Sequence, residues 1–287
     1  MSSSRMRLRR LGRWRRVGGA ALLTAAVVLV AVAPGAPADT SAKRAPTITM
    51  SGSTSVAPLA AKLAQKYVQS HNVQFRLSQG GSDVGISDVA HGRVSIGNSS
   101  RDPKPTDPGG LVFHKIARDA ICVVTNTANG LPNLSQSGVQ AIFHGSVRHW
   151  NQVPGAGRGS NTIDLFVRTA ASGTQDAFQK LFMDPVSVNN SIAKQLASNG
   201  LVQQKVKSDP DGIGYVSLFF AKGPHPVAYK GVACNLRNAK SGQYGGVRNF
   251  WMVTKGNQPA AAISFIHWVQ NSSAAQAIVA TNWVPLH

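Results

Sequence analysis

Three loops rich in serine, threonine and glycine carry the residue types in this sequence that are best suited to chemistry. They span residues 51–58 (SGSTSVAP), 79–85 (QGGSDVG) and 168–174 (RTAASGT). Hydroxyl groups donate hydrogen bonds, glycine lets the backbone approach a ligand closely, and the planar Arg168 guanidinium can engage two oxygens at once. This combination favours the binding of a small oxyanion.

Each loop stands between a strand pattern and a helix pattern. Short strands are expected over residues 47–50, 73–77 and 163–167, and each following loop opens into an apolar pattern at helical spacing. A fourth short strand, 94–96, opens into Gly97-Asn-Ser-Ser-Arg101. A helix start offers free N–H groups and the positive end of a dipole. One such loop is usually only a helix cap, but three, one of them with Arg168, indicate anion donors that converge.

Other chemistries lack their signatures. No loop matches GxxxxGK[ST] or GxGxxG, so a nucleotide-binding fold is not indicated. All 11 acidic residues are Asp, which argues against mechanisms that need a Glu, such as the HExxH metalloprotease and the two-Glu glycosidase. His144 and His149, the only neighbouring histidines, are five residues apart, a poor spacing for a shared metal on a helix. We expect no metal and no cofactor.

The net charge of +19 is spread unevenly over the 287 residues. Seven of the 30 basic residues are arginines between Arg5 and Arg16, followed by an uncharged run, 17–33, and small residues up to Ala38. This order is typical of a secretory signal peptide over residues 1–38, followed by a linker over 39–45. An uncleaved membrane anchor is the alternative, since about 17 apolar residues is the lower limit for crossing a bilayer. No cysteine lies near this run, so a lipid anchor is not expected.

The remaining charge argues against a nucleic-acid partner. Without the seven arginines, 23 basic residues face 11 acidic ones, a net charge of +12. They are scattered singly along the chain, which is typical of a solvated basic surface that attracts small anions. The two cysteines, Cys122 and Cys234, are compatible with a disulfide in an exported protein and equally with buried thiols.

Several motifs together resemble the phosphate-binding subunit of phosphate ABC importers. They are Ser51-Gly-Ser-Thr-Ser with Pro58-Leu59, Gln79-Gly-Gly-Ser82, Ile96-Gly-Asn-Ser-Ser-Arg101, and Arg168 with Ser172-Gly-Thr174 and Phe178. Further matches are Asp119-Ala-Ile-Cys-Val-Val-Thr-Asn126, Ile142-Phe-His-Gly145 with Trp150-Asn-Gln-Val153, and Gly212-Ile-Gly-Tyr-Val216. The resemblance runs from about Thr47 to the C-terminus.

The resemblance implies an α/β fold of the type II periplasmic-binding-protein class, with two lobes, each a β-sheet flanked by helices. Lobe 1 would take residues 46–121 plus 247–287 and lobe 2 residues 122–246. Phosphate would lie in the cleft between them, and the strand-like runs 121–124 and 247–253 would act as hinges. By position in the family motifs, the implied phosphate-binding residues are Ser53, Thr54, Ser82, Ser100, Arg101, Arg168, Ser172, Gly173 and Thr174.

The function expected from this resemblance is non-catalytic. A monomeric protein, periplasmic or extracellular, would capture inorganic phosphate and deliver it to the membrane permease of an ABC importer. Some family members have an Asp in place of Ser100 that accepts the proton of phosphate, so binding of another tetrahedral oxyanion such as sulfate stays open. A phosphate sensor is a second alternative. A secreted serine hydrolase or phosphatase is less favoured, because no GxSxG elbow is present and no His lies near the serine loops.

Overall fold

The computed structural model describes residues 45–256 and 258–287. The predicted signal peptide, and the predicted linker apart from residue 45, lie outside this part of the chain. None of the helices in the described part is both long enough and apolar enough to cross a membrane.

The first two strand-loop-helix units form as predicted. β1 (Thr47–Gly52) leads to α1 (Ala57–Tyr67), and β2 (Gln74–Leu77) leads to α2 (Ser82–Ala90). β3 (Ile96–Ser99) follows, and β1 pairs in parallel with both β2 and β3. Because the three strands run in the same direction, the loops that leave them gather at one edge of the sheet.

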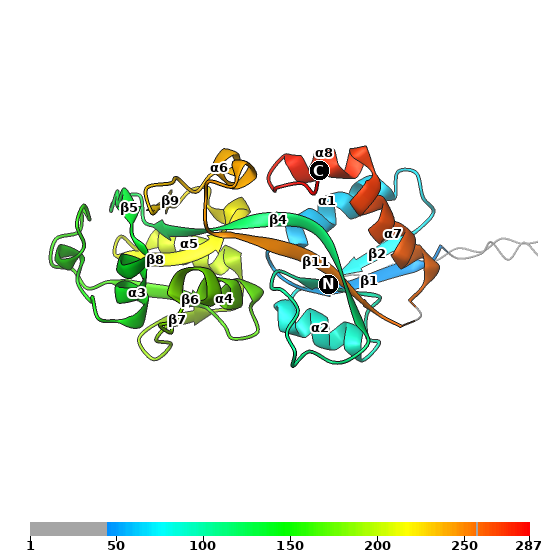
Figure 1. Ribbon diagram of the computed structural model, residues 1–287, viewed down its shortest axis with the longest axis horizontal. Coiled ribbons are helices and arrows are strands. Elements are labelled where there is room, and N and C mark those ends of the chain that lie inside the picture. The colour runs from blue at the N-terminus through cyan, green and yellow to red at the C-terminus, as the bar shows by residue number, and fades with distance from the viewer. Residues whose placement is uncertain (1–44, 257) are drawn as a thin grey trace, which may run out of the picture. The chain divides into compact units, whose positions relative to one another are not determined.

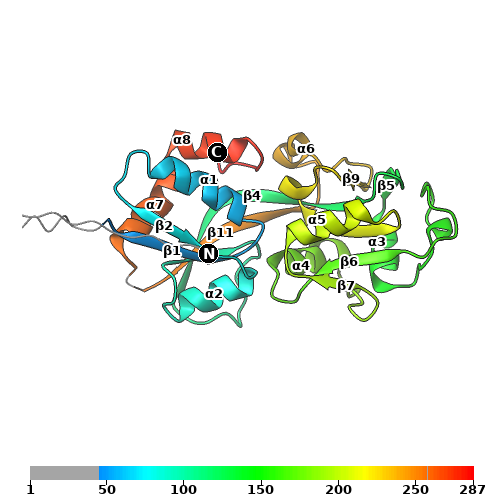
Figure 2. The same cartoon turned by 180° about the vertical axis from the view of Figure 1, so that it is seen from behind.

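The third unit also forms as predicted. β6 (Asp164–Arg168) is followed by α4 (Gly173–Phe178) and a π-helical turn, η2 (Gln179–Met183). The side chain of Ser172 caps α4 by accepting hydrogen bonds from the backbone N–H groups of Thr174 and Gln175. β6 pairs in parallel with β7 (Lys194–Leu196) and β8 (Gly212–Ser217), and α5 (Asn199–Ser208) packs on β8 and β6, as Figure 2 shows.

Two long antiparallel strands join these units. β4 (Leu111–Thr125) and β11 (Val247–Lys255) pair over nine residues of β11 and run side by side in Figure 1. The sheet order is β2-β1-β3-β11-β4-β8-β6-β7. The runs 121–124 and 247–253, expected to be strands, therefore both lie in these connecting strands.

The remaining elements are short strands and helices around this sheet. They are β5 (Asn133–Leu134), α3 (Gln136–His144), η1 (Trp150–Gln152), η3 (Leu218–Phe220), β9 (His225–Pro226), β10 (Ala228–Tyr229), α6 (Leu236–Ser241), α7 (Ala260–Asn271) and α8 (Ser273–Ala280).

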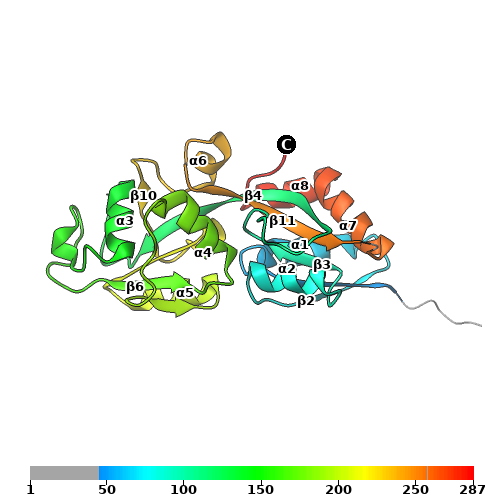
Figure 3. The same cartoon turned by 60° about the horizontal axis from the view of Figure 1, so that its bottom comes forward.

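The buried side chains form two main cores. The terminal core draws on residues 48–117 and 250–283, with α1, α7 and α8 on one face of the sheet. A small cluster of Ile86, Val89 and Val253 covers the other face beneath α2, and Figure 1 shows α2 opposite α1, α7 and α8. The central core draws on residues 120–244 together with Val284, and Figure 3 shows α3 and α4 on one side of β6 and α5 on the other.

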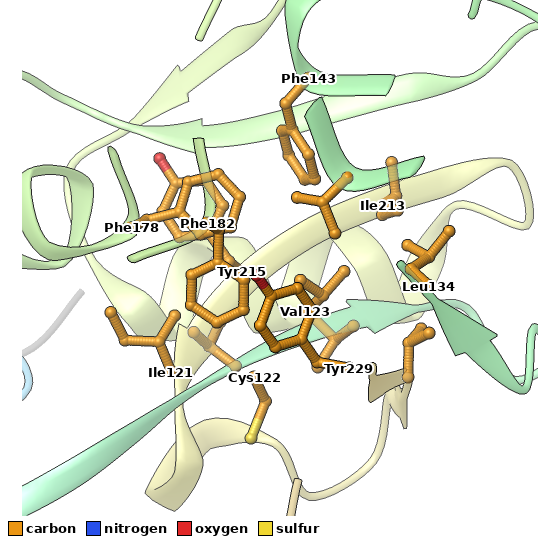
Figure 4. Close-up of a cluster of buried hydrophobic side chains, with 14 of the residues drawn as sticks. Ile121, Cys122, Val123, Leu134, Phe143, Phe178, Phe182, Ile213, Tyr215 and Tyr229 are labelled. Atoms are coloured by element: carbon orange, nitrogen blue, oxygen red, sulfur yellow. The ribbon is translucent and has the colours of Figure 1, made fainter. Parts of the chain in front are cut away.

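The central core is rich in aromatic rings and contains the disulfide. Phe178 stacks on Tyr215, with ring centroids 3.8 Å apart, and Phe143 meets both rings edge-on, as Figure 4 shows. Cys122 on β4 is bonded to Cys234, with Cα atoms 5.6 Å apart. The pairing that the sequence left open is therefore present.

Candidate functional site

Three predicted site serines meet at the ends of the parallel strands next to the terminal core. The Ser53 hydroxyl donates to Ser100 Oγ over 2.8 Å, and Ser82 Oγ lies 3.3 Å from Ser100 Oγ. The backbone N–H of Ser100 donates to Ser82 Oγ over 2.9 Å. All three side chains are buried. The loops are separated in the sequence, and the sheet order β2-β1-β3 brings them together.

The loop before α4 closes on this cluster from the side of the central core. A Cβ atom at Gly173 would overlap Ser82 Oγ and come within 2.8 Å of Ser100 Oγ, so only glycine fits there. The Thr174 hydroxyl lies 2.9 Å from Ser55 Oγ, and Thr54 Oγ1 accepts a hydrogen bond from Asn199 over 3.0 Å. The hydroxyl groups of both sides therefore form one continuous polar cluster.

Arg168 adds a buried cation to the cluster. It is 1% exposed, and its side chain donates to the carbonyl oxygens of Leu196 and Ala197 and, over 3.5 Å, to Thr174 Oγ1. None of the ion pairs among residues 45–256 and 258–287 involves Arg168. Burial, and secondarily the nearby Arg248, lowers the pKa of the Arg168 guanidinium to about 10. A cation buried without a counter-charge favours an anion beside it.

The Arg101 guanidinium points elsewhere. It donates to Asp83 over 2.7 Å and forms a forked contact with Asp107 at 2.6 and 3.0 Å. Although burial opposes it, these two carboxylates raise the pKa of Arg101. Of the residues predicted from the family motifs, Arg101 is the one whose side chain the structure places in an ion-pair network that holds the loop after β3.

The sequence reasoning missed five residues that the structure places in or against the cluster. They are Ser55, Asp119, Asn199, Ser217 and Arg248. Arg248 Nη1 lies 3.0 Å from Thr174 Oγ1, and Nη2 lies 2.9 Å from both Ser55 Oγ and Asp119 Oδ2. A usable signal was present for Arg248, because it is the one charged residue in the strand-like run 247–253.

A groove of about 710 Å³ opens beside the cluster. Its charged lining includes Arg101, Arg118, Arg248, Lys104 and Lys180 together with Asp102, Asp176 and Asp184. Basic residues thus outnumber acidic ones, which attracts anions toward the groove and toward Arg248 in its lining. Two ion pairs within this lining, Lys104–Asp176 and Lys180–Asp102, join the segment after β3 to α4 and η2.

The described residues give the cluster neither a histidine base nor a set of metal-ligating side chains. The hydrogen bonds of histidine rings in residues 45–256 and 258–287 go to groups outside the cluster. No group of three or more His, Cys or Asp side chains in the same residues is placed to hold a metal ion. The arrangement of hydroxyls and guanidinium groups is suited to binding an oxyanion by hydrogen bonds.

Comparison with known proteins finds a matching family model and named relatives. Residues 37–273 match the family model of the PBP superfamily domain. The phosphate-binding protein PstS of Bacillus subtilis is 26% identical over 243 residues, which cover 83% of this chain and 79% of that protein. The protein of the same name from Borreliella burgdorferi is 25% identical over 245 residues, 81% of this chain and 87% of that one.

Two solved structures are similar over their whole length. One is a substrate-binding protein assigned to a phosphate ABC transporter of Clostridium perfringens, with phosphate bound. It is 27% identical with a TM-score of 0.79, covering 84% of this chain and 100% of that chain. The other is an ABC-type phosphate transport receptor from Vibrio cholerae, 27% identical with a TM-score of 0.66, covering 83% and 99%.

Proposed function

The chain belongs to the PBP superfamily, and on that basis we propose that it is an extracytoplasmic receptor that captures inorganic phosphate for an ABC importer. The names of its relatives and the phosphate bound in the Clostridium perfringens structure support this ligand. In this proposal the protein binds its ligand without chemical change and hands it, as a monomer, to a membrane permease.

The observation that carries the proposal is the buried and unpaired charge of Arg168. Among the described residues, its guanidinium has only carbonyl and hydroxyl oxygens as partners. An isolated buried cation is costly, and a phosphate ion beside it would supply both the missing charge and acceptors for the surrounding hydroxyls. We propose that Ser53, Thr54, Ser82, Ser100, Arg168, Ser172, Gly173 and Thr174 form this binding site.

The two cores support a division into lobes. We propose that lobe 1 comprises residues 46–121 plus 247–287 and lobe 2 residues 122–246, with β4 and β11 as the connecting strands. The contacts Ser55–Thr174 and Thr54–Asn199 then join one lobe to the other across the site. Such contacts would form when the lobes close around the ligand. They would break when the lobes open and the ligand leaves through the basic groove.

A secreted serine hydrolase is the competing proposal, and the geometry gives it no support. Nucleophilic catalysis by serine needs a base within hydrogen-bond reach. The hydroxyls of Ser53 and Ser82 contact Ser100 instead of a histidine. Binding is therefore the function that this arrangement supports best.

Removing single donors tests the proposal. We expect Arg168→Ala and Thr174→Val each to weaken phosphate binding at least about tenfold, since a buried hydrogen bond to a charged group contributes about 1.5–3 kcal/mol. Isothermal titration calorimetry with inorganic phosphate measures this. Arg76→Ala, an exposed arginine on β2, is the matched control and should bind like the parent. Unchanged phosphate affinity in both site variants would show that phosphate does not bind at Arg168 and Thr174.

A further inference from the structure

Arg248 and Asp119 form a buried ion pair on the two connecting strands. They face each other in the register of β11 and β4. Arg248 Nε and Nη2 contact Asp119 Oδ2 at 3.2 and 2.9 Å. Asp119 is 1% exposed and Arg248 is 6% exposed. Because both strands are anchored in both cores, this guanidinium has a fixed place between the two sides of the hydroxyl cluster.

The free edge of the Arg248 guanidinium reaches hydroxyls from both sides. Nη1 lies 3.0 Å from Thr174 Oγ1 and 3.3 Å from Ser100 Oγ, and Nη2 lies 2.9 Å from Ser55 Oγ. Thr174 also lies next to Arg168. The same hydroxyl is therefore shared by two guanidinium groups, which is the arrangement expected where one small anion is held from two directions.

Neither carboxylate oxygen of Asp119 contacts a hydroxyl group of the predicted site residues. Its Oδ2 accepts from Arg248, and its Oδ1 accepts from the hydroxyl of Ser217 over 2.9 Å. Asp83 and Asp107 are bound to Arg101. Among the described residues, no carboxylate hydrogen-bonds to the hydroxyls of Ser53, Ser82, Ser100 or Thr174. A ligand proton would thus find no carboxylate acceptor.

The charge of this group of side chains is +1. Arg168 and Arg248 contribute two positive charges and Asp119 one negative charge. Tyr215, whose hydroxyl accepts from the Arg168 backbone N–H, adds no charge, and burial raises its pKa further above the ordinary value. Burial raises the pKa of Asp119 and lowers that of Arg248, and their ion pair opposes both shifts. Arg101 faces the same loops with Asp83 and Asp107 as its counter-charges.

We propose that Arg248, held in place by Asp119, is a second anion-binding residue, and that the pair makes the site select tetrahedral oxyanions by charge, so that fully deprotonated dianions such as sulfate bind as well as phosphate. This proposal rests on the proposed oxyanion-binding function. A site that selects through a carboxylate acceptor needs a protonated ligand and rejects sulfate. A hydroxyl group can donate to a ligand oxygen or accept from a ligand hydroxyl, so a site of guanidinium and hydroxyl groups has no such requirement.

Calorimetric titration of the protein with phosphate and with sulfate, at about pH 6 and about pH 8.5, tests it. Phosphate changes from mainly monoanion to mainly dianion over this interval while sulfate stays a dianion. We expect phosphate affinity to rise about tenfold, sulfate affinity to change by less than about threefold, and the two anions to differ by less than about tenfold at the higher pH. Phosphate binding with sulfate at least about 1,000-fold weaker would overturn this proposal and leave the proposed function intact. Loss of binding by both anions would overturn both.

Two variants separate charge selection from a structural role. Asp119→Asn keeps the shape of the side chain and raises the charge of the group to +2, so the preference for dianionic over monoanionic phosphate should grow about tenfold. If Asp119 only supports the fold, the variant loses stability with an unchanged preference, and the proposed role of Asp119 is wrong.

Arg248→Lys keeps the charge and removes the forked donor, and it provides the test if Asp119→Asn does not fold. We expect affinity for both anions to fall at least about tenfold while their ratio changes by less than about threefold. Affinity equal to that of the parent for both anions would show that Arg248 does not contact the ligand.

Discussion

Gly173 is the residue at which the two sides of the site come closest. A side chain there would collide with Ser82 and would press on Ser100 and on the backbone N–H of Arg101. The loop can therefore deliver Thr174 and the start of α4 to the serine cluster only without a Cβ atom. Arg168 reaches the same place from β6, and its backbone N–H is held by the hydroxyl of Tyr215.

A methyl group at this position should separate the two sides of the site. We expect Gly173→Ala to weaken phosphate binding at least about tenfold, because the added Cβ keeps the Thr174 loop away from Ser82. Calorimetry with phosphate gives the affinity. Gly200→Ala is the matched control, since a Cβ atom there meets nothing closer than 3.8 Å. Equal affinity for phosphate in the two variants would contradict the close approach.

At the scale of elements, the pattern of strand, polar loop and helix was predictable from the sequence. The loops at 51–58, 79–85 and 168–174 follow strands and open into α1, α2 and α4, because local residue types decide where strands end and helices begin. Which loops meet was not predictable from spacing alone, since it depends on the sheet order β2-β1-β3 and on the long-range pairing of β4 with β11. The shared residue types of the three loops predicted converging donors, and the family resemblance indicated which residues of each loop would contact the ligand.

The same dependence on long-range pairing explains why the sequence did not point to Arg248 and Asp119. Both lie in strands that were predicted as hinge or match segments, and neither was assigned to the ligand. Their pairing links residues 129 positions apart in the chain and exists only in the register of β11 with β4. Arg101 is the converse case, because its place after Ser100 suggested a ligand contact whereas Asp83 and Asp107 hold its side chain.

The disulfide is an element-scale constraint, since it ties β4 to the segment before α6. The disulfide joins residues 112 positions apart and so restricts the unfolded chain. We expect Cys122→Ala combined with Cys234→Ala to lower the free energy of unfolding by about 2–5 kcal/mol. Urea denaturation measures it, with the reduced parent protein as control. The bond lies in the central core, so phosphate affinity should change by less than about threefold. A loss of binding without a loss of stability would contradict this assignment.

At the scale of the whole molecule, two separate cores with a polar cluster between them fit a protein that encloses its ligand. The cluster consists of buried hydroxyls and guanidinium groups, and the basic groove of about 710 Å³ gives access to Arg248. The net charge of +12 predicted for the chain without residues 1–38 would attract anions over a distance, whereas in the proposed function binding itself depends on buried donors. Added salt weakens the long-range attraction, whereas it screens the buried hydrogen bonds to the ligand much less.

The most direct test of phosphate capture is therefore calorimetric titration with phosphate at about 0.05 M and about 0.5 M sodium chloride. An anion enclosed by buried hydrogen bonds is little screened, so we predict a single site per chain whose affinity changes by less than about fivefold between the two salt concentrations. Absence of a saturable site, or an affinity that falls by more than about 100-fold, as for binding to an exposed basic surface, would contradict the proposed capture of phosphate in an enclosed site.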